Sequence, residues 1–184
     1  MSLQRPDGPA ARDRRSRVRL FLQCAAVVLL GGGTGALAQR VYGLIARAAP
    51  DFTLHAVAGG NVRLSEHRGE VVVLSFWSSG CGTCRSQLDA LNRSLATYHS
   101  AGLEVYGVGL DDVPARAADY ARGVPVAFPM LLDPSKAVGR AYEVDNLPMT
   151  VLIDRNGTIR NVLRDFSMKS DDVYLQQLRV LLNE

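Results

Sequence analysis

The sequence predicts an α/β domain built on a mixed β-sheet with helices on both faces, and three observations support this. Residues 71–76 form a nearly continuous apolar and β-branched run, as expected for a buried central strand. Residues 103–110 repeat this pattern after a helical stretch, so the two strands are expected to be parallel. A hairpin and a final helix follow, which makes the sheet mixed, with about four or five strands.

Two short strands are predicted ahead of the central strand. Residues 52–55 form the first, and the Gly-Gly-Asn sequence at residues 59–61 has the chemistry of a hairpin turn. The turn leads into residues 62–64, which form the second strand.

The elements after the central strand are predicted from apolar spacing and turn residues. A helix is expected from near Cys81 to about Ser100, because Leu88, Leu91 and Leu95 recur at helical spacing. The others are, in order, a helix over 114–122 that a proline can begin, an extended piece over 128–132, a small helix over 133–142, strands over 150–153 and 158–163 joined by a turn, and an amphipathic helix over 171–182.

The length of 184 residues suits one domain plus an additional segment, and a hydrophobic content of 47% suffices for a sizeable core. The formal net charge of +3 is unevenly distributed. Residues 1–19 hold six arginines against two aspartates, a net charge of +4, whereas residues 20–184 hold 15 basic and 16 acidic residues, a net charge of −1. The body has no basic run interleaved with aromatic residues, so we expect no nucleic-acid partner.

The N-terminal region predicts attachment to a membrane. Residues 1–19 form a basic, largely disordered tail, and residues 20–38 carry no charge and are long enough to cross the ~30 Å bilayer core as a helix. By the positive-inside rule the tail is cytoplasmic and the chain after the helix is periplasmic or otherwise extracytoplasmic. The length of the apolar run favours a single-pass anchor, and the alternative is a secretory signal cleaved after Ala38. A linker is expected over 39–50 and the folded domain over 51–184.

Cys81 and Cys84 form the pair Cys-Gly-Thr-Cys, whereas Cys24 lies alone in the apolar segment and is interpreted as a small apolar residue. The pair is expected where the central strand meets the next helix, and there the free N–H groups and the helix dipole stabilise a thiolate on Cys81. Cys84, further along, is placed to attack a mixed disulfide on Cys81. The two thiols alone can therefore perform thiol–disulfide exchange, without a metal or cofactor.

Other roles for the cysteine pair are less well supported. A structural zinc site needs four ligands, but the chain has no second cysteine pair, and His55, His67 and His99 are scattered. Covalent haem attachment would need a histidine directly after Cys84, where Arg85 stands. A pair of idle buried cysteines is the remaining alternative, and it would leave the small-residue turn before the helix without a purpose.

Residues 72–84 and 147–159 together resemble the thioredoxin-fold family, and within it the membrane-anchored TlpA/ResA-like thiol–disulfide oxidoreductases of bacteria. The resemblance covers roughly residues 49–184 and implies a thioredoxin-like sheet. It also implies a cis peptide bond at Pro148, which lies against the dithiol. Pro148 and Leu147 are both implied to bind the substrate, with the backbone of Leu147 offered to a substrate strand. Trp77 is implied to pack beside the dithiol and contact the substrate, and a place in the plain core is its alternative.

Four residues depart from the family pattern. Gly80 stands where many relatives have Trp before the first cysteine, and Thr83 where they often have Pro. Thioredoxins bury an Asp at the position of Ser75, and ResA-like proteins have a Glu at that of Gln87. An amide cannot accept a proton, so the group that takes the Cys84 proton is not identified by the pattern.

We therefore expect a membrane-tethered thiol–disulfide oxidoreductase that acts on disulfides or thiols of exported proteins. The resemblance implies the reducing direction, and an oxidising compartment then requires a membrane electron donor to reset the dithiol. A peroxidase of the same fold is an alternative: Ser78 meets the peroxiredoxin pattern, but Leu74 stands where that pattern has Pro. A tethered, non-enzymatic binding module is the other alternative.

Overall fold

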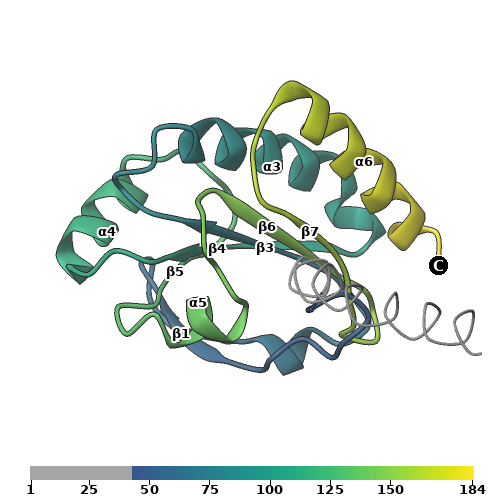
Figure 1. Ribbon diagram of the computed structural model, residues 1–184, viewed down its shortest axis with the longest axis horizontal. Helices are drawn as coiled ribbons and strands as arrows, with labels where there is room; N and C mark the ends of the chain where they lie inside the picture. Colours follow the sequence, from purple (N-terminus) through teal and green to yellow (C-terminus); the bar gives the residue numbers. More distant parts are fainter. Residues whose placement is uncertain (1–42) are drawn as a thin grey trace, which may run out of the picture. The chain divides into compact units, whose positions relative to one another are not determined.

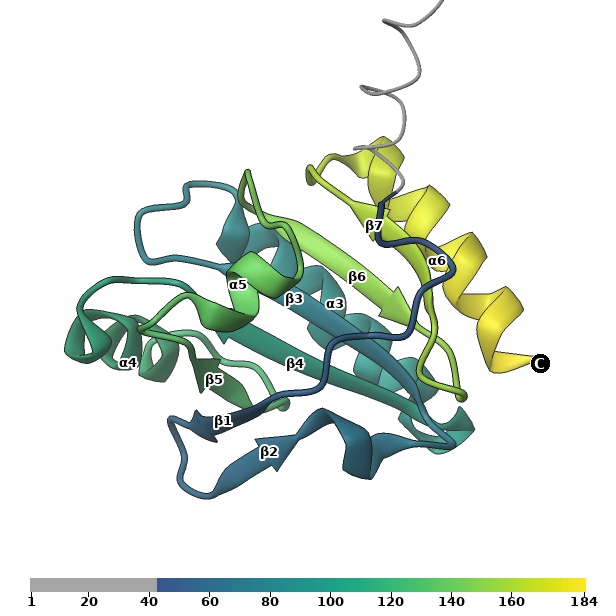
Figure 2. The ribbon, with the colours of Figure 1, turned by 60° about the horizontal axis from the view of Figure 1, so that its bottom comes forward.

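Strand β3 (Val71–Trp77) lies inside a seven-stranded mixed sheet formed by the described residues, in the order β2-β1-β5-β4-β3-β6-β7. It pairs in parallel with β4 (Leu103–Gly109) and antiparallel with β6 (Met149–Ile153). All of its residues are buried, as its apolar sequence predicts. The computed structural model, drawn in Figures 1 and 2, describes residues 43–184 except for the side chains of residues 168–171.

The other strands are β1 (Thr53–Ala56), β2 (Asn61–Arg63), β5 (Met130–Leu132) and β7 (Ile159–Leu163). The helices are α3 (Cys84–Tyr98), α4 (Pro114–Arg122), α5 (Ala137–Ala141) and α6 (Met168–Leu182), with 3-10 turns η1 (Leu64–His67) and η2 (His99–Ala101). The sheet is wider than the expected four or five strands, because β1 pairs with β5 and thereby adds the β1–β2 hairpin to the sheet.

Helices cover both faces of the sheet, as predicted. Alternate residues of β3 point to opposite faces, so Val73 belongs to one hydrophobic cluster and Leu74 to the other. The first cluster contains buried residues of α3, α4 and α6, and the second contains residues of α5 and η1. Figure 1 shows α3 and α6 on one side of the sheet and α5 on the other.

Helix α3 begins at Cys84, later than the sequence predicted. Cys81 therefore lies in the turn before the helix and not in its first turn. Gly80 and Gly82 flank Cys81, and glycine is a poor helix former because it loses much backbone entropy on ordering.

Residues 44–49 pack against the sheet, although a linker was expected over 39–50. The N–H of Ala46 donates a hydrogen bond to the carbonyl oxygen of Ile159 at 2.8 Å, and Leu44 is buried. Figure 2 shows this segment running beside β7. The compact unit starts at Leu44, before the expected start of the domain, because a short edge pairing leaves no periodic pattern in the sequence.

The predicted basic tail at residues 1–19 and the predicted membrane segment at residues 20–38 lie outside the described residues. Among the helices from residue 43 onward, none has both the length and the apolar character that a bilayer span requires.

Candidate active site

Cys81 and Cys84 are joined by a disulfide, and their Cα atoms are 5.4 Å apart. Cys81 lies in the turn between β3 and α3, and its N–H donates to the Ser78 carbonyl oxygen at 3.1 Å. Cys81 is half-buried, whereas Cys84, the first residue of α3, is fully buried. Another molecule can therefore reach the sulfur of Cys81, but the sulfur of Cys84 is shielded.

The N-terminus of α3 lies directly after the turn that carries Cys81. The N-cap residue Thr83 makes no side-chain capping bond, and the first turn contains no acidic residue. The first N–H groups of a helix have no partner within it, and together with the helix dipole they stabilise a nearby thiolate. The structure places Cys81 just before a helix N-terminus, and the stabilised thiolate stays a prediction.

A cleft of about 580 Å³ opens beside Cys81. Its walls come from the turn before Cys81, the residues that follow β4, the start of α4 and the loop before β6. Leu147 lines this cleft, and the peptide bond between Leu147 and Pro148 is cis, as the resemblance implied. Pro148 itself is buried and does not line the cleft, so Leu147 is the residue of this pair that a substrate in the cleft would meet. The structure therefore brings the cysteine pair and the proline loop to one place.

Trp77 lies in the core and not in the cleft. Its exposed fraction is 0%, and it shares a hydrophobic cluster with Cys84 and Leu88. The indole packs over two glycines of β4: a Cβ added at Gly109 would lie 2.7 Å from Trp77 Cζ2, and one added at Gly107 would lie 3.1 Å from Nε1. The substrate contact implied for Trp77 is therefore wrong, because a fully buried ring cannot touch a substrate. Its packing beside the dithiol and its alternative place in the core both agree with the structure.

Tyr120 of α4 stacks on Trp77, with ring centroids 5.2 Å apart and planes inclined by 26°. Burial raises the pKa of Tyr120, and the charges of Asp89 and Asp111 raise it further, while Arg85 lowers it. The phenol therefore stays neutral and serves as a packing partner for the indole.

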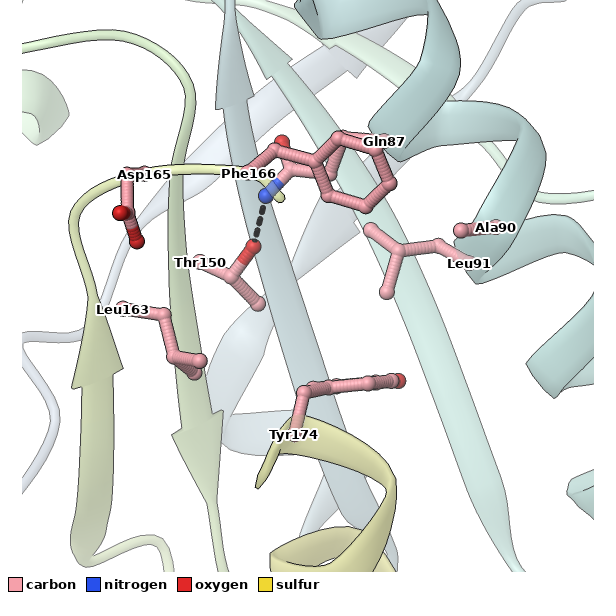
Figure 3. Close-up of a pocket in the computed structure, with 8 residues that line it drawn as sticks. All are labelled: Gln87, Ala90, Leu91, Thr150, Leu163, Asp165, Phe166 and Tyr174. Carbon is pink, nitrogen blue, oxygen red and sulfur yellow. Dashed lines mark hydrogen bonds between the residues drawn. The ribbon is translucent and has the colours of Figure 1, made fainter. Parts of the chain in front are cut away.

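A buried network of neutral polar groups occupies the region where the family resemblance places carboxylates. Ser75 Oγ donates to Gln87 Oε1 at 3.0 Å, and Gln87 Nε2 donates to Thr150 Oγ1, the bond drawn in Figure 3. Ser75 and Gln87 were singled out from the sequence, whereas Thr150 was missed. Thr150 pairs directly with Ser75 between β6 and β3, so the strand register would have identified it.

A small pocket of about 20 Å³ adjoins this network and is lined by Gln87, Thr150 and Asp165, among others (Figure 3). This volume is enough for about one water molecule. No cysteine lines the pocket, so the larger cleft is where a substrate would meet Cys81.

Ser79 and Asp111 are further residues of the site that the sequence analysis missed. The N–H of Ser79 donates to Asp111 Oδ2 at 2.9 Å, the Ser79 hydroxyl donates to Oδ1, and both residues line the cleft with Cys81. The sequence contained a signal for Asp111, because this residue follows the carboxyl end of β4. The carboxyl ends of adjacent parallel strands meet at the same edge of a sheet, where α/β proteins bind ligands.

This arrangement defines a thiol–disulfide oxidoreductase of the thioredoxin fold, with a redox disulfide at the start of a helix and the loop before a cis proline lining the same cleft. The family model described as "AhpC/TSA family" matches residues 45–162, and the chain belongs to this family.

Comparison with known proteins agrees with this class. The chain is 32% identical over 127 residues to thiol-disulfide oxidoreductase ResA of Geobacillus kaustophilus (strain HTA426). The aligned region covers 69% of this chain and 73% of that protein. It is 30% identical over 115 residues to ResA of Bacillus subtilis (strain 168), which covers 62% of this chain and 64% of that protein.

Solved structures show the same fold. A protein assigned as the thiol:disulfide interchange protein DsbE of Chlorobium tepidum superposes with a TM-score of 0.72 and is 35% identical, covering 75% of this chain and 97% of that one. The pneumococcal exposed lipoprotein thioredoxin Etrx1 of Streptococcus pneumoniae superposes with a TM-score of 0.64 and is 28% identical, covering 72% of this chain and 100% of that one. The protein is therefore an enzyme, a thiol–disulfide oxidoreductase.

Proposed function

We propose that this oxidoreductase reduces disulfides in exported proteins, with Cys81 as the attacking cysteine and Cys84 as the resolving one. The observation that carries this proposal is the unequal exposure of the two sulfur-bearing residues. Cys81 is half-buried and faces the cleft, whereas Cys84 is fully buried. A substrate disulfide would therefore meet Cys81 first.

The reaction needs only the two cysteines and a proton acceptor. The Cys81 thiolate attacks one sulfur of the substrate disulfide, a new S–S bond forms, and the other substrate sulfur leaves as a thiolate. Cys84 then loses its proton, attacks Cys81 Sγ and releases the second substrate thiolate. The substrate gains two electrons and the pair Cys81–Cys84 is oxidised. Because Gln87 cannot take a proton, the Cys84 proton passes to water or to the leaving thiolate.

The substrate would bind along the cleft. Leu147 and Cys81 line the same cleft, so a chain joined to Cys81 by a mixed disulfide passes Leu147. We infer that the backbone of Leu147 contacts this chain, while the buried Pro148 supports the loop from behind. This contact would orient the substrate sulfur for attack by Cys81.

We further propose that residues 20–38 anchor the enzyme in the bacterial inner membrane, with the catalytic domain outside the cytoplasm. The uncharged run and the arginines that precede it support this orientation. The description of the pneumococcal relative as an exposed lipoprotein is consistent with work outside the cytoplasm. An oxidising compartment does not reduce the pair again, so a membrane electron donor would reset it. The mass of the mature protein distinguishes an intact anchor from cleavage after Ala38.

Trapping with the Cys84→Ala variant tests the attacking role of Cys81. Without the resolving thiol, we expect a mixed disulfide to accumulate on Cys81 and to release an exported protein when a reductant is added. The control is the double variant Cys81→Ala/Cys84→Ala, which should trap nothing. If the Cys84→Ala variant traps no exported protein, or if the double variant traps as much, the proposal is wrong.

Two measurements separate this function from the alternatives. A redox titration with glutathione should give a reducing potential, and a strongly oxidising one would reverse the proposed direction. Hydrogen peroxide turnover should be negligible, because Leu74, where peroxiredoxins carry Pro, is buried in β3. A phenotype that survives both Cys81→Ser and Cys84→Ser would instead support a binding module.

A further inference from the structure

The carboxylate of Asp111 holds the turn that carries Cys81. Both of its oxygens accept hydrogen bonds from Ser79: Oδ2 from the backbone N–H at 2.9 Å and Oδ1 from the hydroxyl. Ser79 precedes Cys81 by two residues, and the N–H of Cys81 donates to the Ser78 carbonyl oxygen in the same turn. The position of the Cys81 backbone therefore depends on a residue that follows a different strand.

The strand register brings Asp111 to this place. Trp77 pairs with Gly109 between the parallel strands β3 and β4, and the N–H of Leu110 donates to the Trp77 carbonyl oxygen at 2.9 Å. The two chains thus leave the sheet side by side, and Asp111 lies opposite Ser79. Both side chains line the cleft that Cys81 faces.

Asp111 differs from the other carboxylates of the cleft in its partners. Asp112 forms an ion pair with Lys136 at 2.6 Å, and Asp145 forms one with Arg164. Asp111 accepts hydrogen bonds from Ser79, a neutral residue, and is partly buried. Hydrogen bonds hold a carboxylate in place without removing its charge. The charged groups that line the cleft with Cys81 are Asp111, Asp112, Asp145, Arg116 and Lys136. On the packed helices, the charges of Arg85 and Asp89 act on Tyr120.

We propose that Asp111 is a positioning residue of the redox site. It fixes the turn before Cys81, and its negative charge makes the Cys81 thiolate less stable than it would be beside the same helix N-terminus without Asp111. A negative charge near a thiolate raises its free energy, and a less stable thiolate destabilises the reduced dithiol. A less stable reduced form gives up electrons more readily, so Asp111 biases the enzyme toward reduction of its substrate. This inference rests on the proposed role of Cys81 as the attacking cysteine.

The test compares the pH profile of Cys81 alkylation in the reduced full-length protein. Iodoacetamide reacts with the thiolate, and peptide mass spectrometry follows Cys81 separately from Cys24 and Cys84. Asp111→Asn keeps the shape of the side chain and removes its charge. We expect the midpoint of its rate profile to move to lower pH by about half a unit. A smaller neutral variant, Asp111→Ser, gives the same test should the asparagine variant not fold.

Two control variants separate the charge of Asp111 from other effects. Asp112→Asn removes the neighbouring negative charge. Because the Asp112 side chain is 83% exposed and paired with Lys136, this variant should move the alkylation midpoint less. Ser79→Ala keeps the carboxylate and the backbone hydrogen bond, so its midpoint should not fall. An unchanged midpoint in both Asp111 variants, or an equal shift in Asp112→Asn or Ser79→Ala, overturns the inference.

A glutathione equilibrium gives an independent result. At a pH above the alkylation midpoints of both proteins, we expect Asp111→Asn to favour the reduced dithiol about threefold more than the wild type does. This ratio is the expected half-unit shift of the midpoint expressed as an equilibrium constant. An equilibrium that does not move, or that moves toward the disulfide, contradicts the inference. Neither measurement needs a protein substrate, so failure of the trapping experiment with these shifts present would refute the proposed function and leave the role of Asp111 intact.

Discussion

Gln87 shows how one neutral residue changes the chemistry available to the dithiol. Its side chain is 3% exposed, and its amide is held between the Ser75 and Thr150 hydroxyls. The amide is on the first turns of the helix that begins with Cys84, where the resemblance to ResA-like proteins places a carboxylate. An amide at this position cannot store the proton of Cys84.

The Gln87→Glu variant should be less stable at neutral and alkaline pH than at acidic pH. Burial disfavours the charged carboxylate, so the pKa of the new side chain is higher in the folded state than in the unfolded state. Stability is then lost as the pH rises from the unfolded value, about 4.3, to the raised folded value. We expect a loss of about 3 kcal/mol at pH 8 relative to pH 4, measured by urea unfolding and compared with the wild type.

The matched control is Gln176→Glu, which makes the same chemical change at an exposed position of α6. Its unfolding free energy should follow that of the wild type at both pH values. Equal pH dependence in the two variants would show that the environment of Gln87 does not penalise a charge.

Strand β4 is the element that allows the indole of Trp77 to lie beside the cysteine pair. Its sequence places glycines at positions 107 and 109, and both leave room for the ring. Tyr120 of α4 stacks on the indole ring. The sheet and α4 together therefore hold the aromatic side chain that packs in the cluster with Cys84.

The Gly109→Ala variant should be destabilised because its Cβ would lie 2.7 Å from the ring of Trp77, which has no free space to move into. Overpacking of this kind costs about 1–3 kcal/mol, which thermal unfolding would measure. Trp77 fluorescence should change as well, since it is the one tryptophan of the chain. Gly82→Ala, where a Cβ meets nothing within 4 Å, should stay within about 0.5 kcal/mol of the wild type. Comparable losses in both variants would contradict this account.

At the scale of the whole molecule, the folded unit includes residues 44–49, which close the edge of β7. The N–H of Ile159 donates to the Arg47 carbonyl oxygen at 2.8 Å, and Ala48 forms a bridge with Thr158. An unpaired sheet edge exposes backbone groups that favour association with other chains. The start of the unit thus protects one edge of the sheet and adds Leu44 to the core.

The Leu44→Ala variant should lose about 2–3 kcal/mol of unfolding free energy, because it removes a side chain that is only 6% exposed in the second hydrophobic cluster. Thermal unfolding of the full-length protein in detergent would measure this loss. Val113→Ala, at a position that is 47% exposed, should change the stability by less than about 0.5 kcal/mol. A Leu44→Ala variant as stable as the wild type would mean that this segment does not belong to the folded unit.

The sequence by itself was enough to predict the alternating strands and helices, the parallel pair β3–β4 and the cysteine pair between β3 and α3. These features depend on local periodicity and on residues close together in the chain. The resemblance to a known family added the cis bond before Pro148, which the structure contains. The same local patterns did not reveal that β1 and β2 widen the sheet.

Only the tertiary structure decided which side chains meet at the site. Asp111 reaches Ser79, and Thr150 reaches Gln87, because the registers of β3 with β4 and with β6 place them together. The same registers bury Trp77 away from the cleft, against the expectation of substrate contact. Strand register is set by hydrogen bonds and packing between residues far apart in the chain, and no periodicity within a single segment encodes it.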